Sequence, residues 1–242
     1  MIIIAEIGIN HNGSLHLAHE LIRQAKQNGA DIAKFQFYDP AKIFGPQGSH
    51  PNEEAYRQAL TVQFGYDDAR RLKQWCDEEG IEFMASAFDE ERFMWLEELG
   101  VRRHKIASRT VQERELCSKI LATGKECFIS LGLWTERHAP YQAANTSYLL
   151  CVTKYPCEYS DIPMPASFAS SVYEGFSDHT LGIEASLVAI GRGATVIEKH
   201  FTLNKGLVGP DHICSMTPEE LFALSRLGRE MEKVTRLTLS GN

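Results

Sequence analysis

The most constraining feature of this sequence is a regular alternation of short apolar runs with segments of helical period. Strands that alternate with helices of about 10–15 residues are typical of βαβ units and a parallel sheet. Eight such units in 242 residues favour a closed barrel over an open sheet. The sequence therefore predicts an α/β fold, a (β/α)8 TIM barrel, as a single domain over residues 1–242. The eight predicted strands are residues 2–9, 32–37, 83–88, 104–107, 127–131, 148–153, 174–177 and 195–201.

Two helices can be placed from their ends. Apolar residues at positions 18, 21, 22 and 25 have the spacing of an amphipathic helix, and Gly29 suits its C-terminal end. A capping box at Thr217-Pro218-Glu219-Glu220 predicts the start of the last helix. Its predicted core stripe is Leu224, Leu227, Gly228 and Met231.

Two connections depart from the regular pattern. Residues 40–65 are long and rich in turn residues, and residues 156–172 hold three prolines with little helical period. Long loops on a rigid scaffold often carry function, so we expect irregular, functional segments here.

Composition excludes several classes of partner. The net charge is −7, from 25 Lys and Arg against 32 Asp and Glu, so there is no basic footprint for nucleic acid or an anionic membrane. The N-terminal apolar run is too short for a signal peptide, and no 18-residue apolar stretch occurs. Six cysteines form no CxxC pair, which indicates reduced core thiols. We therefore expect a soluble cytoplasmic protein.

Polar residues gather where the predicted strands end, which is the catalytic face of a (β/α)8 barrel. Lys34 and Gln36 are two positions apart and share one strand face. Because a buried charge costs several kcal/mol unless it is paired, a cluster of ionisable groups at one end of a barrel must be compensated by other charges. A bound anion and a bound metal would supply such charges. The strand-end residues are Glu6, Lys34, Gln36, Lys105, Ser108, Ser130, Ser177, Asp178, His179, Glu198, Lys199 and His200.

Each of these residues also has a purely structural interpretation. A lone lysine in a strand is usually a surface residue, and a lone strand histidine is usually a hydrogen-bonded core residue. As a pair on adjacent strands, His179 and His200 suit a divalent metal with positions left for water and substrate. Glu6 is either a paired interior carboxylate or a general base. Asp211 lies in a turn-rich cluster that is either a plain surface turn or a lid.

Six motifs occur in order along the whole chain, and together they resemble the sialic acid synthase (N-acetylneuraminate synthase) family. Members of that family condense phosphoenolpyruvate with an amino sugar, release phosphate and make a 2-keto-3-deoxy acid. The motifs are Ala5-Glu6-Ile7-Gly8-Ile9-Asn10-His11-Asn12-Gly13-Ser14, Lys34-Phe35-Gln36, Lys105-Ile106-Ala107-Ser108, Ser177-Asp178-His179-Thr180-Leu181-Gly182, Glu198-Lys199-His200-Phe201-Thr202-Leu203 and Gly209-Pro210-Asp211-His212.

The resemblance implies a role for each matching position. A divalent metal, typically Mn²⁺ with Mg²⁺ or Co²⁺ as alternatives, would be held by His179 and His200. Lysines and hydroxyls would bind the phosphate and carboxylate of phosphoenolpyruvate, and Glu6 would handle protons at its C2 atom. The implied catalytic residues are Glu6, Lys34, Lys105 and His200, and the implied substrate-binding residues are Gln36, Ser86, Ser108, Arg109, Ser130, Thr153, Tyr155, Ser177 and Asp211.

The sequence also departs from the family pattern, mainly on the side of the acceptor sugar. Arg109-Thr110 replaces the usual glycine and glutamate, and this new positive charge suggests a more anionic or differently substituted sugar. Thr153 stands where asparagine or serine is usual, and Ser86 where threonine is usual. Family members usually carry a C-terminal antifreeze-like domain that adds an arginine to the acceptor site, whereas this sequence ends at Asn242.

The leading hypothesis is therefore a metal-dependent, phosphoenolpyruvate-consuming sugar-acid synthase that acts on an aldose other than N-acetylmannosamine. One alternative is a non-catalytic barrel that binds a sugar or phosphate. Another is the barrel half of a split sialic acid synthase. A homodimer is possible, but the sequence carries no clear signal for one.

Overall fold

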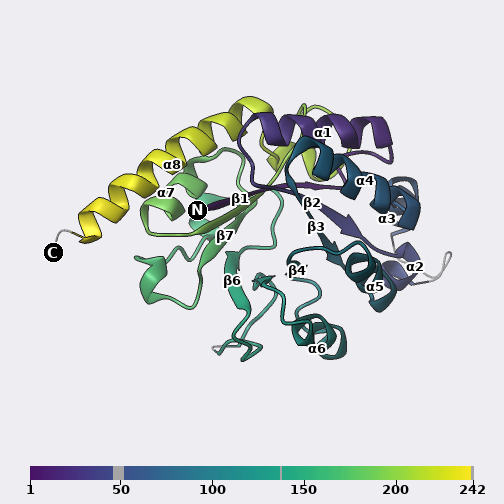
Figure 1. The fold of residues 1–242 in the computed structure, drawn as a ribbon, viewed down its shortest axis with the longest axis horizontal. Helices are drawn as coiled ribbons and strands as arrows, with labels where there is room; N and C mark the ends of the chain where they lie inside the picture. Colours follow the sequence, from purple (N-terminus) through teal and green to yellow (C-terminus); the bar gives the residue numbers. More distant parts are fainter. Residues whose placement is uncertain (46–51, 137, 241–242) are drawn as a thin grey trace.

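The computed structural model describes residues 1–45, 52–136 and 138–240. Within these residues, eight parallel strands close into one barrel in chain order (Figure 1), which confirms the predicted fold. All eight predicted strands occur, with ends shifted by at most two residues. The strands are β1 (Ile2–Gly8), β2 (Ile32–Phe37), β3 (Glu82–Ala87), β4 (His104–Ile106), β5 (Cys127–Ser130), β6 (Thr146–Cys151), β7 (Gly175–Asp178) and β8 (Val196–His200).

Helices lie outside the barrel and cover its strands (Figure 1). Helix α1 buries the predicted apolar face, and Gly29 follows its end with φ +93°, a backbone conformation that favours glycine. The helices are α1 (Leu15–Gln27), α2 (Pro40–Phe44), α3 (Glu53–Val62), α4 (Tyr66–Glu79), α5 (Glu90–Glu98), α6 (Arg114–Ala122), α7 (Glu184–Gly191) and α8 (Pro218–Ser240), with short 3-10 turns at Tyr159–Asp161, Phe168–Ser170 and His212–Cys214.

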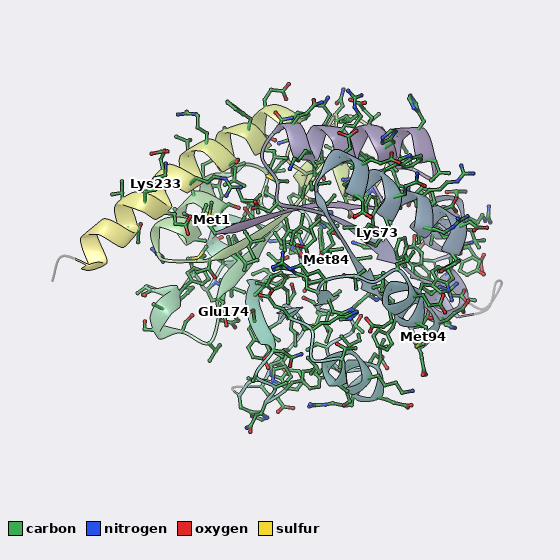
Figure 2. All side chains as sticks on the ribbon, in the orientation of Figure 1. Met1, Lys73, Met84, Met94, Glu174 and Lys233 are labelled. Atoms are coloured by element: carbon green, nitrogen blue, oxygen red, sulfur yellow. The ribbon has the colours of Figure 1, made fainter. Side chains whose placement is uncertain are left out.

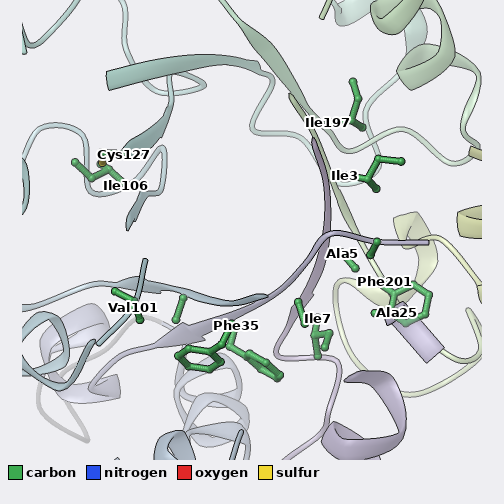
Figure 3. Close-up of a cluster of buried hydrophobic side chains, with 14 of the residues drawn as sticks. Ile3, Ala5, Ile7, Ala25, Phe35, Val101, Ile106, Cys127, Ile197 and Phe201 are labelled. Carbon is green, nitrogen blue, oxygen red and sulfur yellow. The ribbon is translucent and has the colours of Figure 1, made fainter. Parts of the chain in front are cut away.

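Apolar side chains from the outer strand faces form the larger core, between the sheet and the helices. Figure 3 shows part of it, where Ile3 of β1 lies next to Ile197 of β8, and Ala5 and Ile7 follow further along β1. Each of these side chains is fully buried. Burying an aliphatic side chain of the size of isoleucine contributes roughly 1.5–3 kcal/mol, so this layer holds the strands and helices together.

A second apolar cluster fills the barrel interior. Six strands each contribute one buried residue, and Met84 of β3 lies in the middle of the molecule in Figure 2. This plug closes the N-terminal end of the barrel, so a cavity can form only above it, at the carboxyl ends of the strands. Its buried members are Ile4, Ile32, Met84, Phe128, Leu149 and Val196.

The two irregular connections behave differently. Residues 156–172 contain only the short turns Tyr159–Asp161 and Phe168–Ser170, as predicted. The prediction for residues 40–65 is wrong in part, because helices α2 and α3 form there, and residues 46–51 lie outside the described residues. Helix α3 begins after Asn52, whose side chain accepts a hydrogen bond from Ala55 N.

The last helix begins as its capping box predicts, since Thr217 and Glu220 exchange hydrogen bonds of 2.9 and 3.4 Å. One member of its predicted core stripe is misplaced, because Leu227 is 36% exposed. The six cysteines are all free and buried, as expected for core thiols. Among the described residues, no helix is both long and apolar enough to cross a membrane.

Candidate active site

The strand period places a layer of polar side chains directly above the apolar plug. Alternate residues of a strand point to the same face, so the residue two positions after each plug residue also points into the barrel. Above Ile4 and Ile32 this gives Glu6 and Lys34, and above Val196 it gives Glu198. These residues line a main cavity of about 300 Å³ at the carboxyl ends of the strands.

We call the deep part of the main cavity the floor, formed by Glu6, Lys34, Lys105 and Glu198 with Ser86, Ser130 and Ser177. Lys34 Nζ lies 2.5 Å from Glu6 Oε2 and 3.5 Å from Glu198 Oε2. Lys105 Nζ lies 3.3 Å from Glu198 Oε1. All four charged side chains are at most 6% exposed, so their charges are compensated mainly by one another.

Burial and charge oppose each other at Glu198. Burial alone would raise the pKa of this carboxyl group, but Lys105 and Lys34 outweigh it and hold the pKa at about 2. Burial likewise disfavours the charged form of Lys34, but Glu198 and Glu6 raise its pKa above the ordinary value. Glu198 and Lys34 therefore both stay ionised over the physiological pH range.

Hydroxyl groups complete the floor. Lys105 Nζ donates to Ser130 Oγ at 2.8 Å, and Ser177 Oγ donates to Glu198 Oε1 at 2.8 Å. Ser86 Oγ is buried and has no hydrogen-bond partner in the described structure. A buried hydroxyl group without a hydrogen-bond partner costs free energy. Because Ser86 lines the main cavity, a polar ligand bound there could supply the missing partner.

Glycine is required beside the floor at Gly8. Its φ is +54°, and an added Cβ would lie 3.2 Å from Gln36 Nε2 and 3.3 Å from Glu6 Oε1. Gln36 Nε2 donates to Glu6 Oε1 at 2.7 Å, so a larger side chain at position 8 would press on this hydrogen bond. The Gly8 backbone thus lets Gln36 hold one oxygen of Glu6 while Lys34 holds the other.

The two histidines lie side by side at the ends of β7 and β8, with ring centroids 5.5 Å apart. Val152 O faces His179 Nδ1 at 2.8 Å, and because a carbonyl only accepts, this nitrogen carries the proton and Nε2 is left with a free lone pair. Burial and His200 lower the pKa of His179 to about 3, which keeps the ring neutral. His200 Nδ1 is buried with no hydrogen bond and lies 3.7 Å from Asp211 Oδ2.

These donors fit a divalent cation only in part. Neutral imidazole is the commonest protein ligand of transition metals, and the two rings leave positions for water or substrate. No group of three or more His, Cys, Asp or Glu side chains in the described ranges is arranged to hold a metal ion. An ion at this place would therefore have two imidazole ligands from the chain, and water or substrate would supply the others.

We call the outer part of the cavity the rim, formed by Gln36, Arg109, Thr153, Tyr155 and Asp211. Arg109, Thr153 and Tyr155 are exposed and come from segments that follow the strands. The Arg109 guanidinium lies 5.3 Å above the Phe88 ring and makes no ion pair with a described carboxylate. A side cavity of about 230 Å³, lined mostly by apolar residues, shares Gln36, Phe88 and Arg109 with the main cavity.

The structure brings all fourteen predicted site residues to the main cavity, although their roles remain predictions. Sequence reasoning noted Glu198 at a strand end but gave it no role, whereas it joins both lysines. Its position two residues before His200, and hence on the same strand face, was the available signal. Lys199 points to the other face, where Asp178 Oδ2 lies 3.3 Å from its Nζ.

Comparison with known proteins gives consistent matches. The chain matches the NeuB family over residues 21–237. The N,N'-diacetyllegionaminic acid synthase of Legionella pneumophila is 36% identical over 259 residues, covering 96% of this chain and 72% of the relative. The human N-acetylneuraminate-9-phosphate synthase is 33% identical over 251 residues, covering 96% and 70%. A crystal structure of the N-acetylneuraminic acid (sialic acid) synthetase from Leptospira borgpetersenii serovar Hardjo-bovis, in complex with citrate, has a TM-score of 0.86 and 30% identity, covering 96% and 84%.

Proposed function

Because this chain belongs to the NeuB family, we propose that it condenses phosphoenolpyruvate with an aldose to make a sialic-acid-like 2-keto-3-deoxy acid and phosphate. The chain is an enzyme of the sugar-acid synthase type, as its named relatives are. The observation that carries the proposal is the floor, where two buried lysines and a hydroxyl without a partner face one cavity. Ammonium and hydroxyl groups are the donors that phosphate and carboxylate oxygens need.

Phosphoenolpyruvate would lie in the floor. Lys34 and Lys105 would donate to its anionic oxygens, and Ser86 would gain the partner it lacks. The lysines would then share their hydrogen bonds between ligand and carboxylates, so Glu6 and Glu198 would hold them in place during binding. This preorganisation favours binding because the lysines need no large rearrangement.

A divalent cation, Mn²⁺ or alternatively Mg²⁺ or Co²⁺, is part of the proposal, with His179 and His200 as its ligands. The main cavity is lined by three cationic side chains and three carboxylates, so a phosphate and a carboxylate would leave an excess of negative charge. When bound, such an ion supplies a positive charge and Lewis acidity at the aldehyde oxygen of the acceptor.

In the proposed reaction, C3 of phosphoenolpyruvate forms a bond to the aldehyde carbon, water adds at C2, and the bond from C2 to the phosphate oxygen breaks. Glu6 would take a proton from the water, and its contacts with Gln36 and Lys34, which hold its two oxygens, support this role. Lys34 and Lys105 would stabilise the charge on the leaving phosphate. The rim, with Gln36, Tyr155 and Asp211, would face the sugar.

The acceptor is proposed to be an aldose other than N-acetylmannosamine, with an anionic or otherwise unusual substituent near Arg109. The guanidinium has no carboxylate partner in the described residues and lines both cavities, so an anionic group there would be attracted. Localisation in the cytoplasm and a homodimer also remain predictions.

The test measures phosphate release from phosphoenolpyruvate with Mn²⁺, Mg²⁺ or Co²⁺ against a panel of aldoses, amino sugars and sugar acids. We expect release with one acceptor class and loss of at least about 100-fold in His200→Ala. His16→Ala is the matched control, because His16 is an exposed residue of α1. Metal-independent release, or equal activity in both variants, would remove the metal from the proposal, and no release with any acceptor would overturn the synthase assignment.

A further inference from the structure

The loop between β1 and α1 carries a motif that the proposed chemistry does not use. Its residues Asn10, His11, Asn12 and Gly13 line neither the main cavity nor the side cavity. The loop lies instead against the segment after β8, residues 201–216, which carries Asp211 to the rim. Side-chain hydrogen bonds join the two segments across about 200 residues of sequence.

Asn10 makes the deeper connection. It is 1% exposed, and its Nδ2 donates to Phe201 O at 2.9 Å and to Ser215 Oγ at 2.8 Å. Because a backbone carbonyl only accepts, the amide nitrogen must face Phe201, which fixes the orientation of the side chain. Ser215 Oγ in turn donates to Asp211 O at 2.7 Å. A single path of hydrogen bonds therefore runs from Asn10 to the backbone of Asp211.

Asn12 makes the outer connection. Its Nδ2 donates to Val208 O at 3.0 Å, and His212 Nε2 lies 3.4 Å from its Oδ1. The other nitrogen of the buried His212 ring, Nδ1, lies 2.7 Å from Thr202 Oγ1. The ring therefore links the start of the segment after β8 to Asn12. Asp211 thus lies between two anchored neighbours, Val208 on one side and His212 on the other.

The loop between β1 and α1 is itself held in place by helix α3 and the residues that follow it. The His11 ring stacks on Phe64 with centroids 3.9 Å apart, and its Nδ1 accepts a hydrogen bond from Gly13 N. A Cβ at Gly13 would lie 2.2 Å from Thr61 O, so the loop approaches helix α3 more closely than any other residue type allows. The loop is therefore a rigid anchor that can hold the neighbouring segment in place.

We propose that Asn10 and Asn12 are positioning residues that hold Asp211 in its place opposite His200 at the rim of the cavity. The inference rests on the proposed function, because Asp211 is there assigned to the acceptor. Asp211 Oδ2 lies 3.7 Å from His200 Nδ1, so a small shift of its backbone changes what this carboxylate faces. Misplacing a substrate-contacting group by about 1 Å can cost on the order of 100-fold in rate.

The first experiment measures amide hydrogen exchange, which needs no substrate. Asn12→Gly removes the side chain and keeps the backbone unstrained, because φ at Asn12 is +48° and glycine adopts this conformation freely. We expect exchange in residues 203–211 to accelerate at least about tenfold while the strands keep their protection. Unchanged exchange in residues 203–211 would overturn the proposal whether or not the enzyme is active.

The second experiment is a double-mutant cycle of Asn10→Ala with Asp211→Asn. If Asn10 acts through Asp211, Asn10→Ala lowers kcat/KM for the acceptor about 10–100-fold in the native background and less than about twofold in the Asp211→Asn background. Binding of phosphoenolpyruvate, measured by calorimetry, should change less than about twofold in both. Independent, multiplicative effects of the two substitutions would contradict the proposal.

A matched control separates positioning from general loss of structure. Asn145→Ala removes an asparagine whose Nδ2 also donates to two backbone carbonyls, Leu121 O and Lys125 O, at the opposite end of the barrel. We expect it to lower the melting temperature without changing kcat/KM. If the wild-type protein releases no phosphate with any acceptor, the proposed function fails, and the exchange measurement still decides the positioning role.

Discussion

The floor and the rim of the main cavity are built by different means. The floor comes from strands, its charged side chains are almost fully buried, and each of them pairs with another. The rim comes largely from segments after the strands, Tyr155 is 45% exposed, and Arg109 has no carboxylate partner among the described residues. A site that must perform one chemistry on different sugars benefits from this division, because rim residues can change without disturbing the barrel.

The strongest test of the floor is Lys105→Met. It leaves Glu198 buried with only the more distant Lys34, so we expect activity to fall at least about 1,000-fold and the free energy of unfolding to fall by about 3 kcal/mol. Steady-state kinetics and urea denaturation measure the two effects. Lys119→Met, at a partly exposed lysine of α6, is the control and should leave both activity and stability nearly unchanged. Activity within tenfold of the wild type would show that the floor does not carry the reaction.

The loop between β1 and α1, which carries His11, is expected to make the stability of the protein sensitive to acid. Burial lowers the pKa of His11 to about 3 from its ordinary 6.5, so between these values the unfolded chain binds the extra proton. Stability present above pH 6.5 is therefore lost as the pH falls, by about 2 kcal/mol at pH 5.

His11→Phe keeps a ring against Phe64 but removes this titration. Urea denaturation at pH 7 and pH 5 should show a smaller difference between the two pH values for the variant than for the wild type, by about 2 kcal/mol. Equal pH dependence would mean that His11 is not the acid-sensitive group.

Ser86→Ala distinguishes ligand binding from folding in the floor. Since Ser86 Oγ has no protein partner, its loss should change the free energy of unfolding by less than about 0.5 kcal/mol. The dissociation constant of phosphoenolpyruvate should rise about tenfold, the effect of one hydrogen bond to a charged group. Ser147→Ala should do the opposite, because Ser147 Oγ donates to Glu174 Oε2 far from the cavity. A destabilised Ser86→Ala with unchanged binding would refute the assignment.

The smallest expected effect is at the rim. Arg109→Gln should raise KM for an anionic acceptor about three- to tenfold, leave KM for phosphoenolpyruvate unchanged, and leave stability within about 0.5 kcal/mol. Arg102→Gln is the matched control, because Arg102 is 77% exposed and lies before β4. An equal effect of Arg109→Gln on neutral and anionic acceptors would show that Arg109 does not recognise charge.

Local sequence pattern predicts the barrel well because each strand and helix follows from neighbouring residues. Period two along a strand carries the side chain of Lys34 into the interior above Ile32, and the same rule carries in Glu198 above Val196. Helix α3 escaped prediction because turn residues precede it, although Tyr56, Ala59 and Val62 form its buried face. Apolar residues three apart were the signal that the turn-rich composition obscured.

Contacts between distant segments were beyond sequence reasoning. Nothing local to Asn10 indicates that its amide bonds to Ser215, since this contact depends on closure of the barrel between β1 and β8. The same holds for Lys34 and Lys105, which both pair with Glu198. Their strands, β2 and β4, are not neighbours in the barrel. Polar residues at strand ends could be collected from the sequence, but their pairing follows only from the shape of the barrel.

Closure of the barrel between its first and last strands also orders events during synthesis. The ribosome releases β1 long before β8, so β1 and β7 of the nascent chain expose unpaired edges until residues 196–200 emerge. Until then Lys34 and Lys105 lack Glu198, and Asn10 lacks Phe201 and Ser215, the residues after β8 that it binds. The charge pairs of the floor can therefore be completed only after β8 has been added, and until then the unpaired strand edges of the nascent chain favour aggregation.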